Sequence, residues 1–308
     1  VLGNYAASGV ILLGLWLFAV REHIGLPRGG VALGGLLRFG APTIPADAAV
    51  FLLNVVDRAW LLRAESPDAA GLYSVAIKLA TAVIILVRGF QLAWPPLAYS
   101  ITSDEEAQAL YARVTTVFIA VSGVIVAGFT LLGPWVVRLL AAPDFFAAHT
   151  ALPWLALGWA LYGLYLVLVT IAGRAEVTIR TLPSAALGLV VNVALLALLV
   201  GPLGIDGAAI ALCASYVAML LLLFALTRRA FRVPFQWRRV VPAVLICATV
   251  AVAGEVLLPS DGAAGFASRL LVLVAIPLLL VAARVVSPDE IRALVRSARG
   301  ARGGEAAA

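Results

Sequence analysis

Long apolar stretches separated by short polar connections dominate this sequence. Their lengths match the about 20 residues that a helix needs to cross the hydrocarbon core of a bilayer. The pattern predicts an all-α integral membrane protein with about nine transmembrane helices, the ninth being the weakest because Arg269 lies near its start. The expected spans are residues 1–20, 36–62, 71–99, 114–137, 150–173, 181–201, 207–227, 240–259 and 266–286.

Polar residues and glycines at the ends of these stretches support the boundaries. Ser66, followed by proline, has the pattern of a helix N-cap with proline at the first helical position. Ser103 precedes Glu106 at the spacing of a capping box. Gly204 and Gly207 predict a tight turn between the sixth and seventh spans.

Composition points to the same class of protein. The chain has 308 residues, of which 63% are hydrophobic and only 12% charged. A soluble domain carries about 25% charged residues, and a mean hydropathy of +1.07 leaves too much apolar surface for water as the solvent. Lipid must therefore surround most of the chain.

The distribution of basic residues predicts the orientation. Sixteen of the 22 lie in the connections and tail on one side of the expected membrane, and four lie on the other. Short loops rich in arginine stay cytoplasmic, so we expect residue 1 outside and the C-terminus in the cytoplasm. Because the sequence opens outside, within an apolar run and without methionine, we expect it to be the C-terminal portion of a longer protein.

Signals for enzymatic or cofactor chemistry are weak. Cys213 and Cys247 fall in apolar spans, where they are expected to be small core residues and not a disulfide. No His, Cys and carboxylate cluster has metal-ligand spacing, and no GxxxxGK[ST] motif occurs. We expect no enzyme activity, no catalytic residue, no metal and no cofactor, and we attribute the net charge of +6 to membrane topology and not to nucleic-acid binding.

Two cations lie inside the third span. Lys78 and Arg88 each cost about 2.5–3.5 kcal/mol at the centre of a membrane helix on insertion scales. Snorkelling to the interface and a structural ion pair are the ordinary explanations. On one continuous helix, however, all polar side chains of the segment, Thr81 and Gln91 included, would share a sector about 140° wide. That arrangement predicts a polar stripe in which the two cations line a cavity that receives an anion.

The preceding span has a matching stripe. Asp47, Asn54 and Arg58 recur close to one line along the helix, at 100° per residue. Asp47 and Arg58 are expected to set local charge or to take part in ion coupling, although Asp47 could instead simply pair with Arg88 or a backbone donor. Asp57 and Arg58 are expected near the outer interface, where water can solvate both.

Several of these segments resemble a known family. "LLRFGAPTIPADAAVFLLNVVDRAWLL", "GLYSVAIKLA" and "FQLAWPPLAYS" resemble the seventh and eighth helices of bacterial lipid-linked oligosaccharide flippases. "LPWLALGWALYGLYLVLVTIAGR" resembles their tenth helix, and "GPLGIDGAAIALCASYVAMLLL" the turn before the twelfth and the twelfth itself. These transporters belong to the multidrug/oligosaccharidyl-lipid/polysaccharide exporter superfamily, and the likeness covers about residues 36–240.

The resemblance implies a fold of two six-helix lobes around a V-shaped cavity. The first five helices of the family have no counterpart here, so only one side of the cavity is expected. On this map the chain divides into the last helix of the first lobe (1–20), the cytoplasmic connection between lobes (21–35), the second lobe (36–230), two additional helices (240–286) and a cytoplasmic tail (287–308).

The resemblance also implies a function. It is the translocation of a polyprenyl-pyrophosphate-linked oligosaccharide across the bacterial cytoplasmic membrane by alternating access, during surface polysaccharide assembly. Lys78 and Arg88 would meet the pyrophosphate or acidic sugars, while Gln91, Thr81 and Asn54 would bind sugar hydroxyls. The implied partners are this glycan lipid, membrane lipids and other polysaccharide-assembly proteins. A drug or cation exporter of the same superfamily and a membrane-embedded polysaccharide polymerase or ligase remain the alternatives.

Overall fold

A computed structural model of the chain describes residues 2–20, 40–41 and 43–285. Every regular element within these ranges is helical. The chain divides into two compact units, Val1–Ala41 and Pro42–Ala308. The first unit contains α1 (Leu2–Leu15), which continues into a π-helical turn at Trp16–Val20. The predicted connection 21–35 and tail 287–308 lie outside the described residues.

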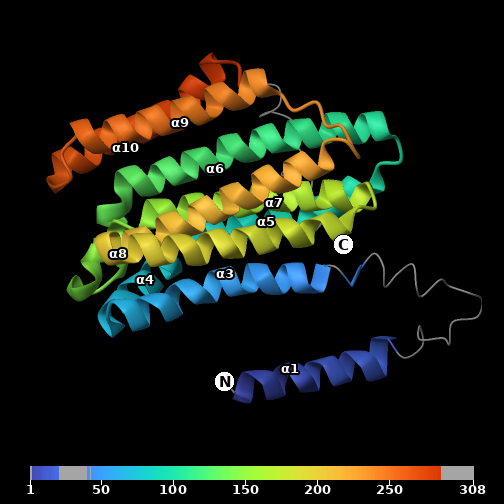
Figure 1. Cartoon of the computed structure of the whole chain (residues 1–308). Coiled ribbons are helices and arrows are strands. Elements are labelled where there is room, and N and C mark those ends of the chain that lie inside the picture. Colours follow the sequence, from blue (N-terminus) through green and yellow to red (C-terminus); the bar gives the residue numbers. More distant parts are fainter. Residues whose placement is uncertain (1, 21–39, 42, 286–308) are drawn as a thin grey trace, which may run out of the picture. The chain divides into compact units, whose positions relative to one another are not determined.

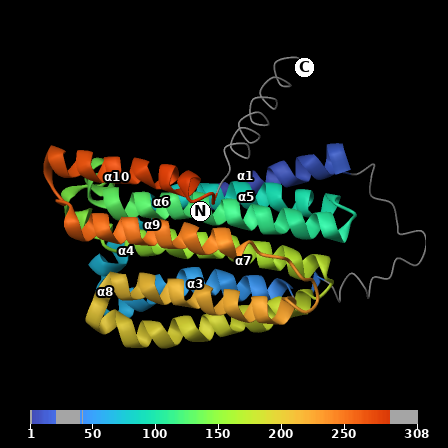
Figure 2. The ribbon, with the colours of Figure 1, turned by 90° about the horizontal axis from the view of Figure 1, so that it is seen from above.

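The second unit is a bundle of helices that run side by side (Figures 1 and 2). Short 3-10 helices at Pro143–His149 and Thr178–Arg180 precede α7 and α8. The helices are α3 (Thr43–Ala64), α4 (Pro67–Leu79), α5 (Thr81–Ser100), α6 (Asp104–Leu140), α7 (Leu152–Arg174), α8 (Thr181–Thr227), α9 (Trp237–Leu257) and α10 (Gly262–Ala282).

Five of these helices, α6 to α10, are long and apolar enough to cross a membrane. Helices α4 and α5 would add a sixth span if they acted as one. Helix α3 falls short because Asp47, Asp57, Arg58 and Arg63 lower its hydropathy, and α1 falls short because it has only 14 residues. The protein is therefore a multi-pass membrane protein by length and composition, but nine separate spans are not confirmed among the described residues.

Helix α8 is a helical hairpin and not one rod. Its backbone leaves helical geometry at Gly204, where φ is +55°, a value that only glycine adopts without strain. The two halves fold back on each other, since Gly188 faces Met219 and Gly207 lies against the backbone of Leu199. The predicted turn between the sixth and seventh spans is confirmed.

The predicted third span, residues 71–99, is wrong as a single straight helix. It consists of α4 and α5, which meet at Ala80 and are bent by 53°. Lys78 lies in the last turn of α4, where its positive charge complements the C-terminal end of the helix dipole. Thr81 is the first residue of α5. Angular positions that assume one continuous helix therefore do not relate Lys78 to Arg88.

Local capping follows the sequence. The Ser66 hydroxyl accepts a hydrogen bond of 3.0 Å from the Ala69 amide at the start of α4, with proline in the first helical position. Ser103 caps α6 in the same way through the Glu106 amide, at 3.5 Å. Both predicted N-caps are confirmed.

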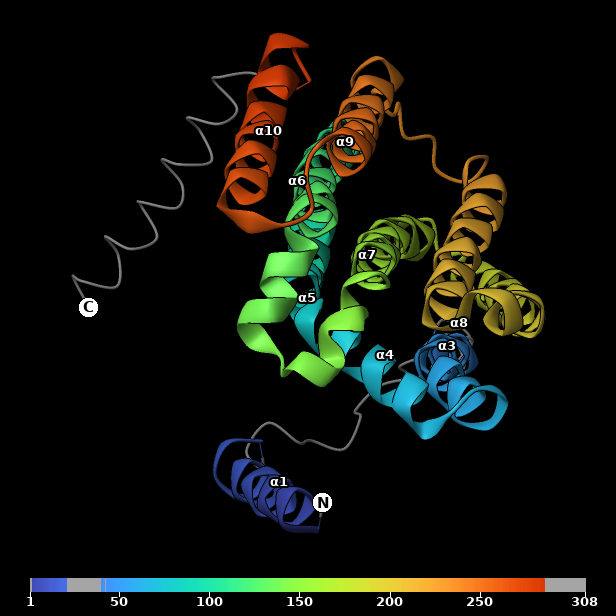
Figure 3. The ribbon, with the colours of Figure 1, turned by 90° about the vertical axis from the view of Figure 1, so that its left-hand side faces the viewer.

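Helix α7 occupies the interior of the bundle. It contacts α4, α5, α6 and α8, while α3 packs against α8 (Figure 3). Helices α9 and α10 pack together against α6 and share a second apolar core with it. In this core, Gly123 of α6 lies directly against Cys247 of α9. Cys213 and Cys247 are buried free thiols, as predicted.

Candidate functional site

Charged residues from two helices lie within electrostatic range of Tyr162 of α7. Asp47 on α3 and Arg88 on α5 both lie close enough for their charges to act on the Tyr162 hydroxyl. Arg88 donates a hydrogen bond of 3.0 Å to the side-chain oxygen of Gln91, one helical turn further along α5. We call Asp47, Arg88, Gln91 and Tyr162 the Tyr162 face. Of the residues that the sequence selected, Arg88 and Gln91 are in direct contact, and Asp47 shares only its electrostatic effect on Tyr162 with Arg88.

Asn54 extends this polar region into the bundle. Its amide donates hydrogen bonds to the Val50 carbonyl (2.8 Å) and to the Tyr216 hydroxyl (3.2 Å). The Tyr216 ring in turn packs against Tyr162, with centroids 5.6 Å apart. Asn54 therefore lies behind the Tyr162 face and connects α3 to the second half of α8.

Lys78 and Thr81 do not join this group. Both side chains are exposed, and neither makes a hydrogen bond or ion pair within the described part of the chain. Arg58 is also exposed, but its charge acts on the neighbouring Asp57 carboxylate. Lys78 lies on α4, across the bend at Ala80 from Arg88 on α5.

The expectation that water solvates Asp57 near the outer interface is wrong, because Asp57 is buried. Its side chain is only 1% exposed in the core where α3 meets α4 and α8. One carboxylate oxygen accepts a hydrogen bond of 2.9 Å from Tyr73, while the other has no partner within the described residues. Asn192 of α8 interacts with this carboxylate electrostatically, yet its own polar atoms are fully buried and make no hydrogen bond of normal geometry there.

A signal for this burial was present in the sequence. Asp57 lies four residues after Leu53 and four before Leu61, so all three share one side of α3. Both leucines are fully buried. An acidic residue in the middle of an apolar stripe is costly unless it is paired or protonated. This cost makes Asp57 a functional candidate. Asp57 is not among the residues selected from the sequence, because its position predicts a place near the outer interface in contact with water.

A large apolar cavity lies apart from these polar groups. It has a volume of about 700 Å³ and is enclosed by α6, α7 and α9. Its few polar side chains include Ser122, Thr130, His149 and Glu255. None of the residues selected from the sequence lines it. In the described ranges, no group of three or more His, Cys, Asp or Glu side chains is placed to hold a metal ion.

This geometry permits two kinds of chemistry. The Tyr162 face offers a guanidinium, a carboxylate, an amide and a phenol hydroxyl, which suits a charged and hydroxylated ligand. The Asp57 carboxylate offers a half-satisfied acceptor that could take up a proton or a small cation. Comparison of the chain with protein-family models and with curated proteins found no match.

Proposed function

We propose that the chain forms one lobe of a flippase for polyprenyl-pyrophosphate-linked oligosaccharides. The observation that carries this proposal is the Tyr162 face, where Arg88 and Asp47 from different helices act on one tyrosine. Ionisable residues within membrane segments are expensive and mark ligand or ion pathways. A sugar–pyrophosphate headgroup needs such groups, because its polar atoms lose water on entering the membrane.

Each residue of the region has a proposed role. Arg88 binds the pyrophosphate, since its planar guanidinium can donate two parallel hydrogen bonds to phosphate oxygens. Gln91 accepts a hydrogen bond from Arg88 and so restrains that guanidinium. Asn54 and Thr81 bind sugar hydroxyls. Lys78 attracts the headgroup from α4 before it reaches Arg88.

Ion coupling is assigned here to Asp57 in preference to Asp47 or Arg58. Both of those side chains are exposed, whereas Asp57 is buried with one oxygen unpartnered among the described residues. Neutralisation of Asp57 by a proton or a monovalent cation would remove the cost of burying its charge between α3, α4 and α8. Binding would thereby favour the closed packing of these helices, and release would favour its opening.

The finer architecture is part of the same proposal. It comprises nine spans in a bacterial cytoplasmic membrane, with residue 1 outside and the C-terminus in the cytoplasm. Residues 1–20 belong to a first lobe, 36–230 form the second, and 240–286 are additional helices. Alternating access would come from rocking of one lobe against the other.

The test is export of lipid-linked glycan by the protein reintroduced into a deletion strain. Arg88→Ala should abolish surface glycan at unchanged membrane abundance. Arg63→Ala is the matched control, because Arg63 is an exposed arginine in the last turn of α3, away from the Tyr162 face. Normal glycan with Arg88→Ala, or an equal loss with Arg63→Ala, would contradict the proposal.

One observation favours the cation exporter as a second candidate. Asp47 and the buried Asp57 place two carboxylates on α3, and exporters of cationic compounds need acidic groups. The same strains, loaded with a cationic fluorescent dye, separate the two functions. Dye efflux that depends on Asp47 and is unaffected by Arg88→Ala would favour the exporter over the flippase.

A further inference from the structure

The connection between α8 and α9 concentrates positive charge at one end of the bundle. Residues 228–239, which comprise this connection and the first turn of α9, read RRAFRVPFQWRR, with five arginines among five aromatic or apolar side chains, a proline and a glutamine. The connection joins two helices that are each long and apolar enough to cross a membrane. It therefore lies where lipid headgroups meet the ends of α8 and α9.

Aromatic contacts hold this connection in place. Phe231 is buried, and its ring packs against Tyr111 of α6 with centroids 5.8 Å apart. The Arg174 guanidinium lies over the same ring at 5.7 Å. Phe235 packs against Phe224 of α8 with centroids 5.9 Å apart. These anchors give the arginines of the connection a defined framework.

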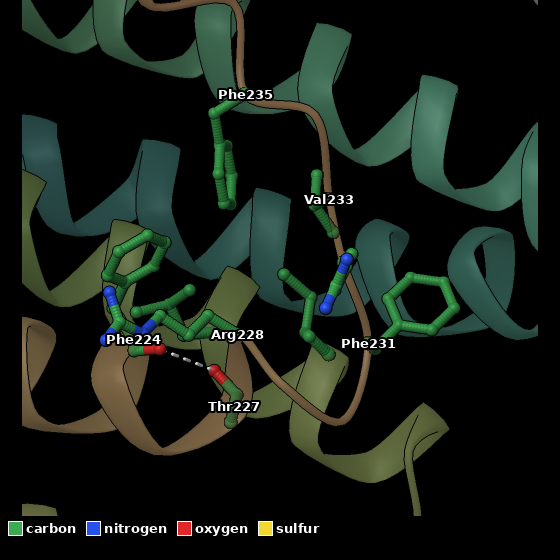
Figure 4. Close-up of a pocket in the computed structure, with 9 residues that line it drawn as sticks. Phe224, Thr227, Arg228, Phe231, Val233 and Phe235 are labelled. Carbon is green, nitrogen blue, oxygen red and sulfur yellow. Dashed lines mark hydrogen bonds between the residues drawn. The ribbon is translucent and has the colours of Figure 1, made fainter.

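A small pocket lies within this framework (Figure 4). Its volume is about 140 Å³, close to the cavity of about 150 Å³ that admits a benzene-sized group. Phe224, Phe231 and Phe235 form much of its wall, and Arg228 and Arg232 also line it. The pocket thus combines an apolar wall with two guanidinium groups.

The two arginines differ from Arg174 and Arg180, which lie at the same end of the bundle. Arg174 donates to the Asp104 carboxylate and to the Ile101 carbonyl, at 2.8 Å each. Arg180 donates to the Leu226 carbonyl. The side chains of Arg228 and Arg232, in contrast, make no hydrogen bond or ion pair with any described residue, and both are exposed. Their donors are free for a ligand from outside the bundle.

We propose that this pocket binds the phosphate of an anionic membrane phospholipid. Two guanidiniums provide charge-assisted hydrogen bonds to phosphate oxygens. The phenylalanine wall suits the glycerol and first methylenes of the lipid, and basic pockets between helices at a membrane face are known headgroup sites. The site requires only that α8 and α9 cross a membrane, so it stands or falls independently of the flippase proposal.

Native mass spectrometry of the purified full chain tests the site, with phosphatidylglycerol, phosphatidylcholine and inorganic phosphate as probes. Phosphatidylglycerol should bind more tightly than phosphatidylcholine. The double variant Arg228→Gln/Arg232→Gln should weaken phosphatidylglycerol binding by about 25-fold, at about fivefold per arginine. Arg229→Gln/Arg238→Gln is the matched control, because it removes equal charge from the same end without altering the pocket.

A second variant keeps the arginines and changes only the space. Val233→Trp should fill the pocket and weaken phosphatidylglycerol binding while Arg228 and Arg232 remain. If Arg228→Gln/Arg232→Gln and the control Arg229→Gln/Arg238→Gln weakened phosphatidylglycerol binding equally, the lipid would be held by the overall surface charge, and the site would be overturned. Unchanged phosphatidylglycerol binding in both Arg228→Gln/Arg232→Gln and Val233→Trp would overturn the site as well. If inorganic phosphate bound in the pocket and phosphatidylglycerol did not, the pocket would be a site for free phosphate, and the proposal of a lipid ligand would be wrong.

Discussion

The Tyr73 hydroxyl donates a hydrogen bond of 2.9 Å to the Asp57 carboxylate, and both side chains are buried where α3 packs against α4. The bond satisfies one oxygen of the acid, while the other has no partner among the described residues. A buried carboxylate in this state gains stability from the Tyr73 contact, and under the flippase proposal it is also the group that takes up the coupling ion.

Tyr73→Phe should destabilise the protein by about 1–3 kcal/mol, because it leaves a buried acceptor without its hydrogen bond. Asp57→Asn should cost less, since the amide oxygen still accepts from Tyr73 and no charge is buried. Thermal unfolding in detergent measures both effects. If Asp57 couples transport to an ion gradient, Asp57→Asn should also make glycan export insensitive to that gradient; retained sensitivity would exclude Asp57 from coupling.

Lys78 and Arg88 should differ in importance because the bend at Ala80 separates them. Lys78→Ala should lower glycan export only partly, since Lys78 lies on α4 away from the Tyr162 face. Arg88→Lys should keep some export if charge alone matters and little if two parallel hydrogen bonds are needed. Surface glycan at equal membrane abundance is the measurement. A greater loss from Lys78→Ala than from Arg88→Ala would reverse the proposed roles.

Gly207 allows the close approach of the two halves of α8. A Cβ atom at this position would lie 2.3 Å from the carbonyl oxygen of Leu199, which belongs to backbone and cannot rotate away. Gly207→Ala should therefore destabilise the hairpin by about 1–3 kcal/mol, as overpacking does. Gly201→Ala is the control, because nothing lies within 4 Å of its Cβ. Detergent melting curves compare the two, and equal melting temperatures would contradict the packing argument.

Arg269 joins α10 to its neighbours from a fully buried position. It donates to the Glu255 carboxylate at 2.6 Å, to the carbonyls of Leu131 and Leu258 at 3.1 Å each, and lies over the Trp135 ring. Arg269→Leu should destabilise the packing of α9 and α10 by about 3 kcal/mol. This value is the lower end of the range for breaking a buried ion pair, because the Glu255 side chain is half exposed.

The control for Arg269 is the exposed pair at the same end of these helices. Arg138 donates to Asp261 at 2.7 Å, but both side chains are accessible to solvent. Arg138→Gln should change stability little, as surface ion pairs do. Limited proteolysis in the connection between α9 and α10 reports the loosening. Similar proteolysis rates for Arg269→Leu and Arg138→Gln would show that burial adds nothing to the contact.

The sequence by itself determined the class of protein and most helix positions. Apolar length predicted the helices, Ser66 and Ser103 marked two helix starts, and Gly204 marked the reversal within α8. These features depend on neighbours a few residues away, such as the amide that a serine caps or the φ angle that glycine permits. They can therefore be recognised without knowledge of the fold.

Only the tertiary structure decided which polar side chains are buried and which meet. Asp57 lies at a position that sequence alone placed near water, yet packing of α3 on α4 and α8 encloses it. Arg88 and Asp47 act electrostatically on Tyr162 from different helices, and the bend at Ala80 places Lys78 on another helix than Arg88. Burial of this kind depends on how each helix is rotated against partners distant in the chain. The 3.6-residue period shows which residues share one side of a helix, as Leu53, Asp57 and Leu61 do, but it does not show which helices that side meets.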